Sequence, residues 1–152
     1  MTYDIEVKEL PARYVASIRV TVAPDQMGPT FEELLPEVLA ELQEQNAQAS
    51  GPSFGIFFEF GEQVDMEAGF PVMLPVESSG RVGFRTLEEG TFAVTWHHGP
   101  YSTIGEAHRA VTQWAEQNGR AIVGPPWEVY WDGPASGKPA AEFRTEVGYP
   151  IG

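Results

Sequence analysis

Glu128 is the residue whose type and position could most readily do chemistry. It stands in the segment Trp127-Glu128-Val129-Tyr130-Trp131, a carboxylate among aromatic side chains. Alternate residues of a β-strand share a face, so we expect Glu128 and Tyr130 to point to one side and Trp127 and Val129 to the other. Burial among aromatic rings disfavours a charged carboxylate, which predicts that Glu128 pairs with a cation or acts as a general acid or base.

An exposed Glu128, or one paired with Arg109 or Arg120, is the alternative interpretation. A segment earlier in the chain, 54–58, matches 127–131 in its aromatic and aliphatic character and has Gly55 where Glu128 stands. A strand of this kind therefore does not require a carboxylate at that position. This difference strengthens the functional interpretation, and the two interpretations stay open on the residues alone.

Three histidines are the candidates for metal binding or proton transfer. His97 and His98 precede Gly99-Pro100-Tyr101, and adjacent residues on a strand point to opposite faces. His108 does not complete a recognisable spacing of zinc ligands. We therefore expect ordinary hydrogen-bonded histidines and no metal site, while Tyr101, beside a helix start, is predicted to line a pocket.

Several other kinds of site are excluded by inspection. The chain has no cysteine, which excludes disulfides, thiolate zinc sites and cysteine nucleophiles and fits a reducing compartment. Neither a phosphate-binding Gly-x-x-x-x-Gly-Lys loop nor a Gly-x-Gly-x-x-Gly fingerprint occurs, so no nucleotide cofactor is expected. The Gly-x-Ser-x-Gly motif of hydrolases is missing as well.

The elements that must position these residues occur twice. The order strand, strand, helix, strand, strand repeats with a period of about 73 residues, which predicts half-repeats at about 1–77 and 81–152 of one domain, 1–152. The first two strands of each half, 7–12 with 14–20 and 84–87 with 92–96, are predicted to form hairpins. We expect an α+β fold with a mostly antiparallel sheet, pseudo-twofold symmetry and a concavity between the halves.

Each helix is predicted to open at a capping box, Thr30 with Glu33 and Thr103 with Glu106. Pro36 indicates that the first helix starts later or kinks, and Asn46 and the pair Asn118-Gly119 indicate helix ends. Apolar residues at helical spacing predict two buried stripes, listed here: Phe31, Leu34, Leu35, Val38, Leu39 and Leu42 in the first helix; Ile104, Ala107, Val111, Trp114 and Ala115 in the second.

Glycine- and proline-rich stretches before the closing strands, 61–69 and 132–139, are predicted to be loops at the rim of a site. Asp65 and Glu67 lie in the first of them. Aromatic residues make up 12% of the chain and concentrate in the predicted strands. Most of these must be core, and a minority, Phe58 among them, are expected to line a cleft for a flat ligand.

The charge of the chain restricts its partners. Nine Lys and Arg against 22 Asp and Glu give a formal net charge of −13, which repels nucleic-acid backbones and anionic lipid surfaces. No membrane span or secretory signal is recognisable, so a cytoplasmic location is expected. These features favour a small-molecule partner that is aromatic and either neutral or cationic. We expect the protein neither to contact nucleic acid directly nor to bind a membrane.

Four segments, 10–16, 98–101, 127–130 and 145–151, follow one another along the chain. In this order they resemble the GyrI-like small-molecule-binding domains, which are also the effector-binding domains of AraC- and MerR-type multidrug regulators. The resemblance spans nearly the whole chain. It implies paired βαββ units, with SH2-like halves, around a central ligand groove. No DNA-binding segment precedes the expected first strand, so a regulatory role would require a separate partner protein.

The resemblance also implies roles for particular residues. Glu128 corresponds to the acidic pocket residue that meets lipophilic cations, and in some members this residue is implicated in hydrolysis of cyclopropane-containing compounds. Tyr130, Tyr101, Trp96 and Tyr149 are carried over as pocket lining. In a hydrolase, Glu128 would activate water and Tyr130 or Tyr101 would donate a proton.

Three functions therefore compete. The first is a stand-alone domain that binds or sequesters amphipathic aromatic or cationic compounds, with Glu128 as the charge partner. The second is a hydrolase of reactive cyclopropane-type compounds, so whether the chain is an enzyme stays open. The third, which the resemblance suggests, is a protein-interaction module that modulates DNA gyrase through its acidic surface.

Overall fold

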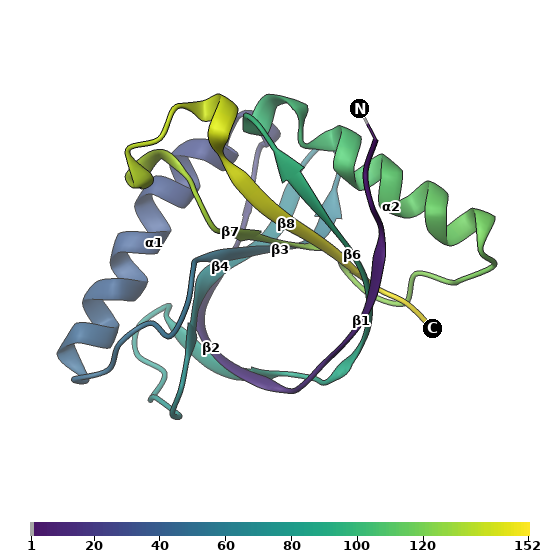
Figure 1. Ribbon diagram of the computed structural model, residues 1–152. Helices are drawn as coiled ribbons and strands as arrows, with labels where there is room; N and C mark the ends of the chain where they lie inside the picture. Colours follow the sequence, from purple (N-terminus) through teal and green to yellow (C-terminus); the bar gives the residue numbers. More distant parts are fainter. Residues whose placement is uncertain (1) are drawn as a thin grey trace. The chain divides into compact units, whose positions relative to one another are not determined.

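The computed structural model describes residues 2–152, whose strands and helices gather into two compact units (Figure 1). The first unit consists of Pro11–Glu89. The second unit consists of the chain up to Leu10 together with Gly90–Gly152. Within the described residues each unit contains one α-helix and four strands, and the adjacent strands within each unit are antiparallel.

In the first unit the strands lie in the order β3-β4-β2-β5. Their bounds are β2 Arg13–Val22, β3 Phe54–Phe60, β4 Val64–Val72 and β5 Gly83–Leu87, and helix α1 spans Met27–Glu44. Helix α1 packs on β4 and β2. The core forms between them because apolar residues alternate along the strands and recur at helical spacing in α1; it contains Ile18, Leu34, Val38, Leu42, Val64, Met66 and Ala68.

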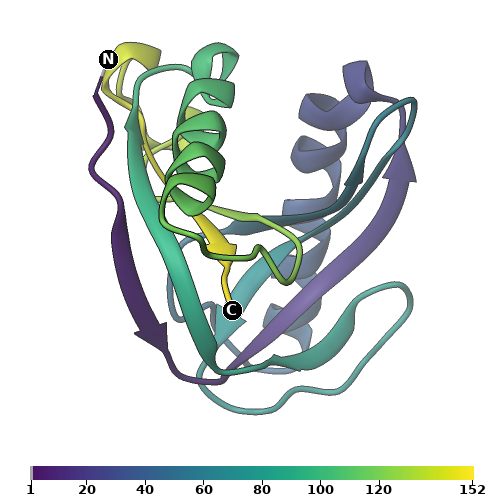
Figure 2. The same ribbon diagram turned by 90° about the vertical axis from the view of Figure 1, so that its right-hand side faces the viewer.

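In the second unit the order is β1-β6-β8-β7. The bounds are β1 Glu6–Leu10, β6 Gly90–His98, β7 Trp127–Tyr130 and β8 Arg144–Pro150, and helix α2 spans Gly105–Gln117. Helix α2 lies against β6 and β8 (Figure 2). Their shared core contains Ala93, Ala107, Val111, Val147, Tyr149 and Ile151.

The predicted fold class, α+β with an antiparallel sheet, is confirmed. In the first unit one strand precedes the helix and three follow it, whereas in the second unit two precede it and two follow it. The spatial orders of the strands nevertheless correspond, β3-β4-β2-β5 in the first unit and β7-β8-β6-β1 in the second. The duplication itself, its boundaries near residues 77 and 81, and the groove between the halves stay predictions.

The two predicted hairpins are wrong. β1 pairs with β6 instead of β2, and β5 pairs with β2 instead of β6. A two-residue hairpin turn needs positive φ in its central residues. Neither Pro11-Ala12 nor Glu88-Glu89 supplies it, because among the described non-glycine residues only Asn46 has a positive φ. The two links therefore carry the chain from one unit to the other instead of reversing it.

The helix starts also differ from the predicted capping boxes. Helix α1 begins at Met27, directly after a 3₁₀ turn at Pro24–Gln26, and continues through Pro36. Helix α2 begins at Gly105 after a 3₁₀ turn at Tyr101–Thr103, and neither helix has a side-chain cap. The Thr103 hydroxyl instead donates to the carbonyl of Pro100, 3.1 Å away. These 3₁₀ turns take the place of the capping side chains.

Both helix ends are where the sequence predicts them. Asn46, just after α1, has a φ of 55°, and Gly119, just after α2, has a φ of 64°. The left-handed conformation favours asparagine and glycine and ends a helix. The buried stripes are confirmed except at Leu39, whose side chain is 44% exposed.

Residues 61–69 are not the predicted loop, because β4 begins at Val64. Val64, Met66 and Ala68 alternate toward the core, which places Asp65 and Glu67 on the opposite face of the sheet. The second predicted loop, 132–139, is confirmed, and it contains a 3₁₀ turn at Pro134–Ser136.

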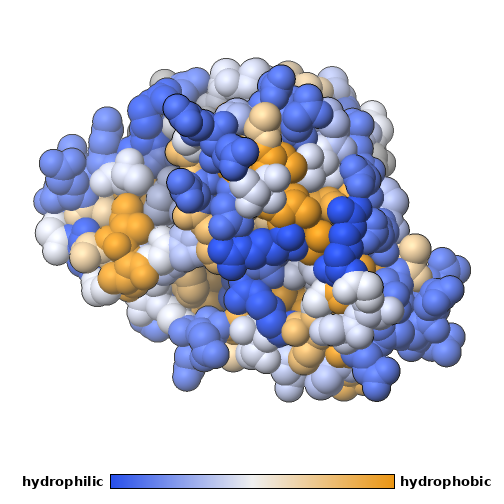
Figure 3. Space-filling view, turned by 180° about the vertical axis from the view of Figure 1, so that it is seen from behind, coloured by the Kyte–Doolittle hydropathy of each residue, from blue (hydrophilic) through white to orange (hydrophobic). Residues whose placement is uncertain are grey.

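The surface is mixed in polarity. Hydrophilic side chains cover much of the face seen from behind, and hydrophobic ones show between them (Figure 3). None of the helices in residues 2–152 is both long and apolar enough to span a membrane.

Candidate functional site

Glu128 is a buried carboxylate whose two oxygens both have partners. Only 8% of the residue is exposed. Nε2 of His108 lies 2.6 Å from one carboxylate oxygen, and the hydroxyl of Tyr130 donates to the other at 2.7 Å. The register of β7 and β8 places Glu128 directly opposite Val147, a core residue that packs with α2. Glu128 therefore points to the side of the sheet that carries α2.

His108 connects Glu128 to Tyr149. It is the fourth residue of α2, and its Nδ1 lies 2.7 Å from the hydroxyl of Tyr149 on β8. An ionised carboxylate only accepts hydrogen bonds, so Nε2 carries a proton. In a neutral imidazole Nδ1 then accepts from Tyr149. The four residues form one chain of hydrogen bonds, Tyr149–His108–Glu128–Tyr130.

Tyr101 adds an aromatic wall beside this chain. Its ring centroid lies 5.7 Å from that of Tyr130 and 5.5 Å from that of Phe143. The residue is 38% exposed, so one part of the ring reaches solvent while the rest packs on its neighbours. Gly133 leaves room for the hydroxyl, since a Cβ at this position would lie 2.8 Å from the Tyr101 oxygen.

The tyrosines of the site remain neutral because their phenolate forms are disfavoured. Burial, together with the charge and hydrogen bond of Glu128, raises the pKa of Tyr130 well above its usual range. Burial and the Glu128 charge raise the pKa of Tyr149 to about 12. The same two causes raise the pKa of Tyr101. Below pH 9 these phenols are therefore proton donors.

The structure brings together four of the six predicted site residues: Glu128, Tyr130, Tyr101 and Tyr149. Trp96 lies on the other face of the sheet, because it stands opposite Glu146 in the register and contacts Trp131, with ring centroids 6.0 Å apart. Phe58 belongs to the first unit, where the Arg19 guanidinium lies 3.7 Å from its ring centroid. The sequence prediction of a shared face for Glu128 and Tyr130 agrees with their hydrogen bond.

His108 is the residue of this cluster that the sequence analysis did not predict. Neither Arg109 nor Arg120, the partners considered from the sequence, holds Glu128; the Nε of Arg120 donates to the carbonyl of Gly152 at 3.0 Å. A signal was present in the sequence. His108 lies four residues after Ile104 and three residues before Val111, which is the spacing of the buried stripe. A polar residue on that stripe requires a buried partner.

The other two histidines take structural or exposed positions. His97 is fully buried; its Nδ1 lies 2.9 Å from the Tyr3 hydroxyl and its Nε2 3.0 Å from the Pro100 carbonyl. His98 is exposed. Among the described residues no group of three acidic, histidine or cysteine side chains could hold a metal ion.

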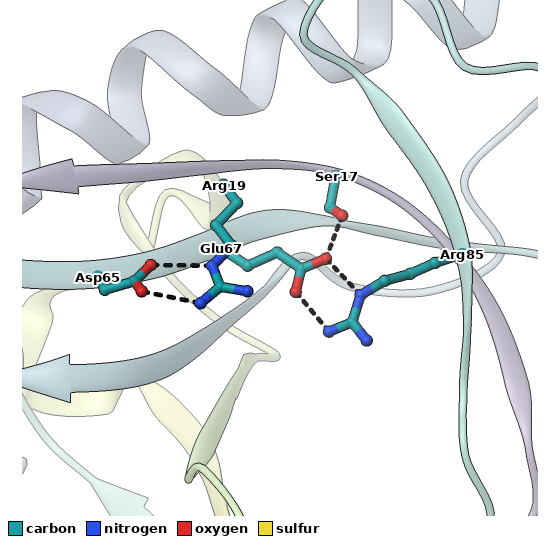
Figure 4. A network of polar contacts seen from close by, with 5 residues as sticks. All are labelled: Ser17, Arg19, Asp65, Glu67 and Arg85. Carbon is teal, nitrogen blue, oxygen red and sulfur yellow. Dashed lines mark hydrogen bonds and ion pairs between the residues drawn. The ribbon is translucent and has the colours of Figure 1, made fainter.

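A second buried carboxylate, Glu67 on β4, lies in the first unit (Figure 4). Arg85 donates from Nε and Nη2 to its two oxygens at 2.9 and 2.5 Å, and the Ser17 hydroxyl also donates to it. Beside it Arg19 and Asp65 form a two-bond ion pair of 2.9 and 2.8 Å. The guanidinium of Arg85 therefore balances the charge of Glu67. The basic partner of Glu128 is instead the imidazole of His108.

Comparison with known proteins decides the family. The model of the family described as "GyrI-like small molecule binding domain" matches residues 3–151. The chain belongs to this family. No curated protein matches the sequence.

Solved structures agree with this assignment. The C-terminal domain of EcmrR is 25% identical to this GyrI-like domain, with a TM-score of 0.91 over all of the chain and 99% of that domain. EcmrR in its complex with DNA is 26% identical, with a TM-score of 0.88 over 98% of the chain. The chain spans 57% of the length of EcmrR in that complex.

Two more distant structures share the fold. SAV2435, bound to tetraphenylphosphonium, is 13% identical, with a TM-score of 0.68 over 98% of this domain and 94% of that chain. A hydrolase encoded by lin2189 from Listeria innocua is 14% identical, with a TM-score of 0.69 over 97% of this domain and 91% of that chain.

Proposed function

We propose that this GyrI-like domain binds aromatic cations beside Glu128, with the carboxylate as the charge partner and Tyr101 and Tyr130 as the aromatic contacts. The observation that carries the proposal is the pair of donors on Glu128, neither of which is a permanent cation. With neutral His108 and neutral Tyr130 the cluster keeps a net charge of −1. A buried negative charge beside aromatic faces attracts a flat or polyaryl cation.

The rings supply the apolar part of this recognition. Tyr101 is the most exposed tyrosine of the cluster, and it meets Tyr130 edge to face, which leaves ring surface for a ligand. A cationic aromatic compound would gain burial of its rings and electrostatic attraction to Glu128 at the same time. An anion of the same shape would gain the burial and lose the attraction.

The test compares tetraphenylphosphonium with tetraphenylborate, which have the same shape and opposite charges. Tetraphenylphosphonium is the cation bound to SAV2435, a protein of the same fold. We expect the wild type to bind the cation more tightly. Glu128→Gln removes the charge and keeps the shape, and it should weaken cation binding by roughly 10- to 100-fold, the effect of losing a partly buried charge pair.

Glu146→Gln is the matched control, because Glu146 lies on the opposite face of the same sheet and its loss changes the net charge by the same amount. It should leave cation binding nearly unchanged at 0.15 M salt, where distant charges are screened. Equal effects of the two substitutions would overturn the assignment of Glu128, because the net charge of the protein would then explain its preference for the cation.

Hydrolysis is a second candidate function, favoured by the 2.6 Å contact between His108 and Glu128. A carboxylate held in this way could accept a proton from water while the hydroxyl adds to an electrophilic ring carbon and a proton is delivered to the carbon that leaves. Incubation with an activated cyclopropane would then yield a product heavier by one water. Mass spectrometry of wild type and Glu128→Gln decides the point, because a water adduct formed equally by both would contradict catalysis by Glu128.

A further inference from the structure

His108 holds a position that cation binding alone does not explain. Its ring nitrogens contact Glu128 at 2.6 Å and Tyr149 at 2.7 Å, so the imidazole is fixed between an acceptor and a hydroxyl group. Its side chain is only 21% exposed. A glutamine or asparagine could supply a similar donor to Glu128, whereas an imidazole can also take up a second proton.

The hydrogen bonds permit two protonation states of the same geometry. In the first, His108 is neutral, Tyr149 donates to Nδ1, and Nε2 donates to Glu128. In the second, Nδ1 also carries a proton and donates to the Tyr149 oxygen, whose own proton turns away. A hydroxyl group can donate or accept, so Tyr149 satisfies both states. The cluster has a net charge of −1 in the first state and zero in the second.

The tyrosines around His108 stay uncharged between pH 5 and pH 8. On β8 burial and the Glu128 charge raise the pKa of Tyr149 to about 12, and the same causes raise the pKa of Tyr130 on β7 well above its usual range. On the 3₁₀ turn before α2 burial raises the pKa of Tyr101. On β6 the ring of His97 is fully occupied by Tyr3, Pro100 and Thr103.

The exposed charges of α2 lie outside this cluster. Glu106 and Arg109 lie on either side of His108 in the helix and are exposed. Burial and the charge of Glu106 raise the pKa of Tyr3, and the charge of Arg109 lowers it. The proton shared by His108 and Glu128 is then the variable charge of the site.

We propose that His108 is a specificity-determining residue, which makes the preference of the site for cations depend on pH. Neutral His108 leaves the charge of Glu128 available, and the site selects an aromatic cation. Protonated His108 cancels that charge, and the site takes cationic and anionic aromatic compounds equally. This inference rests on the proposed function, because it assigns a control to the same site.

Binding and protonation are then linked. A cation bound beside Glu128 disfavours a second positive charge on His108, so cation binding expels a proton in the pH range where His108 is partly protonated. An anion of the same shape has the opposite effect and draws a proton in. A purely structural His108 would produce neither exchange.

The experiment measures binding of tetraphenylphosphonium and tetraphenylborate by titration calorimetry at pH values from 5 to 8. Buffers of different ionisation enthalpy report the proton exchanged with each ligand. We expect the ratio of the two affinities in the wild type to fall about tenfold or more from pH 8 to pH 5, the change produced by loss of about 1.4 kcal/mol of attraction. Proton release should accompany cation binding over the pH interval in which this ratio changes.

Two variants isolate the imidazole. His108→Gln keeps an amide donor for Glu128 and cannot take up a proton, so the affinity ratio should stay nearly constant over this pH range and proton release should disappear. His98→Gln removes an exposed imidazole from β6 and should behave as the wild type does. If His108→Gln does not fold, a histidine-selective NMR titration of the wild type replaces it, with only three imidazoles to assign.

Each outcome separates the inference from the function on which it rests. A cation preference that is the same at pH 5 and pH 8 would overturn the role of His108 and leave cation binding at Glu128 intact. A pH dependence that persists in His108→Gln would also overturn it. Absence of any cation preference at pH 8 would overturn the proposed function, and this inference with it.

Discussion

Nε2 of His108 lies 2.6 Å from a carboxylate oxygen of Glu128, although one residue belongs to a helix and the other to a strand. The packing of α2 on β6 and β8, together with the pairing of β7 with β8, brings these two side chains together. Because Tyr130 occupies the other oxygen and Tyr149 the other ring nitrogen, the position of each group is set by its neighbours. The pair is therefore held in one arrangement inside the second unit.

Alkaline pH should destabilise the protein partly through Tyr149. Its pKa is raised to about 12, above the usual value near 10, so the unfolded state loses the proton first. The stability that depends on this proton is complete below about pH 10 and is lost as the pH rises to 12. Tyr149→Phe removes this dependence, and urea unfolding from pH 8 to 11.5 measures it.

At pH 8 Tyr149→Phe should be less stable than the wild type by about 1 kcal/mol, because His108 loses a hydrogen-bond partner. The difference should shrink as the pH rises. Tyr14→Phe, at an exposed tyrosine, is the control and should follow the wild-type pH profile. A deficit of Tyr149→Phe that is constant across the pH range would contradict the account.

Gly133→Ala should disturb the ligand site more than the fold. The new Cβ would lie 2.8 Å from the Tyr101 hydroxyl, so this exposed ring must move, and a terminal side-chain atom can do so at low cost. Since the moved ring no longer packs on Tyr130 in the same way, we expect tetraphenylphosphonium affinity to change about threefold or more with a stability loss of about 1 kcal/mol or less. Gly61→Ala, with nothing within 4 Å of its Cβ, is the control; equal affinities in both variants would refute the prediction.

Arg85→Ala should destabilise the first unit by about 2 kcal/mol or more, because it removes both guanidinium hydrogen bonds from the buried Glu67 carboxylate and leaves its charge unbalanced. Figure 4 shows this arrangement. Arg81→Ala is the matched control: Arg81 pairs with Glu33 and Glu37, whose side chains are 66% and 38% exposed, so its removal should cost far less. Urea unfolding compares them, and similar losses would mean that the burial of Glu67 has no energetic consequence.

Gly148→Ala should be among the most damaging glycine substitutions, because its Cβ would lie 2.2 Å from the indole ring of Trp127. That ring is buried and cannot withdraw without opening the core, so we expect a loss of about 3 kcal/mol. Gly28→Ala lies in α1 with nothing within 4 Å and should instead stabilise the protein slightly. Thermal unfolding of both variants tests the contrast; equal shifts would contradict the packing described for Trp127.

The sequence was most informative where one local rule acted alone. Period-two and helical patterns predicted the strands and helices, and the placement of Glu128 with Tyr130 followed from strand alternation. The pairing of β1 with β6 could not be predicted in this way, because a strand next in sequence is the default neighbour. Proline in the link between β1 and β2 was the available signal against a hairpin.

The candidate site was predicted in part for the same reason. Tyr101, Tyr130 and Tyr149 join Glu128, but Trp96 belongs to the opposite face, and strand alternation relative to Ala93 in the core would have indicated this. His108 was missed because a helix and a strand had to be packed together before its partner existed. Interaction with gyrase or with a regulator protein stays a prediction from the resemblance.

The most direct test of the central claim is a crystal structure of the domain with tetraphenylarsonium, the arsenic analogue of tetraphenylphosphonium, recorded at a wavelength where arsenic scatters anomalously. We predict one strong anomalous peak beside the Glu128 carboxylate and the rings of Tyr101 and Tyr130, and its loss in Glu128→Gln. A peak on Trp96 and Trp131, across the sheet from Glu128, or a peak that Glu128→Gln leaves unchanged, would contradict the claim.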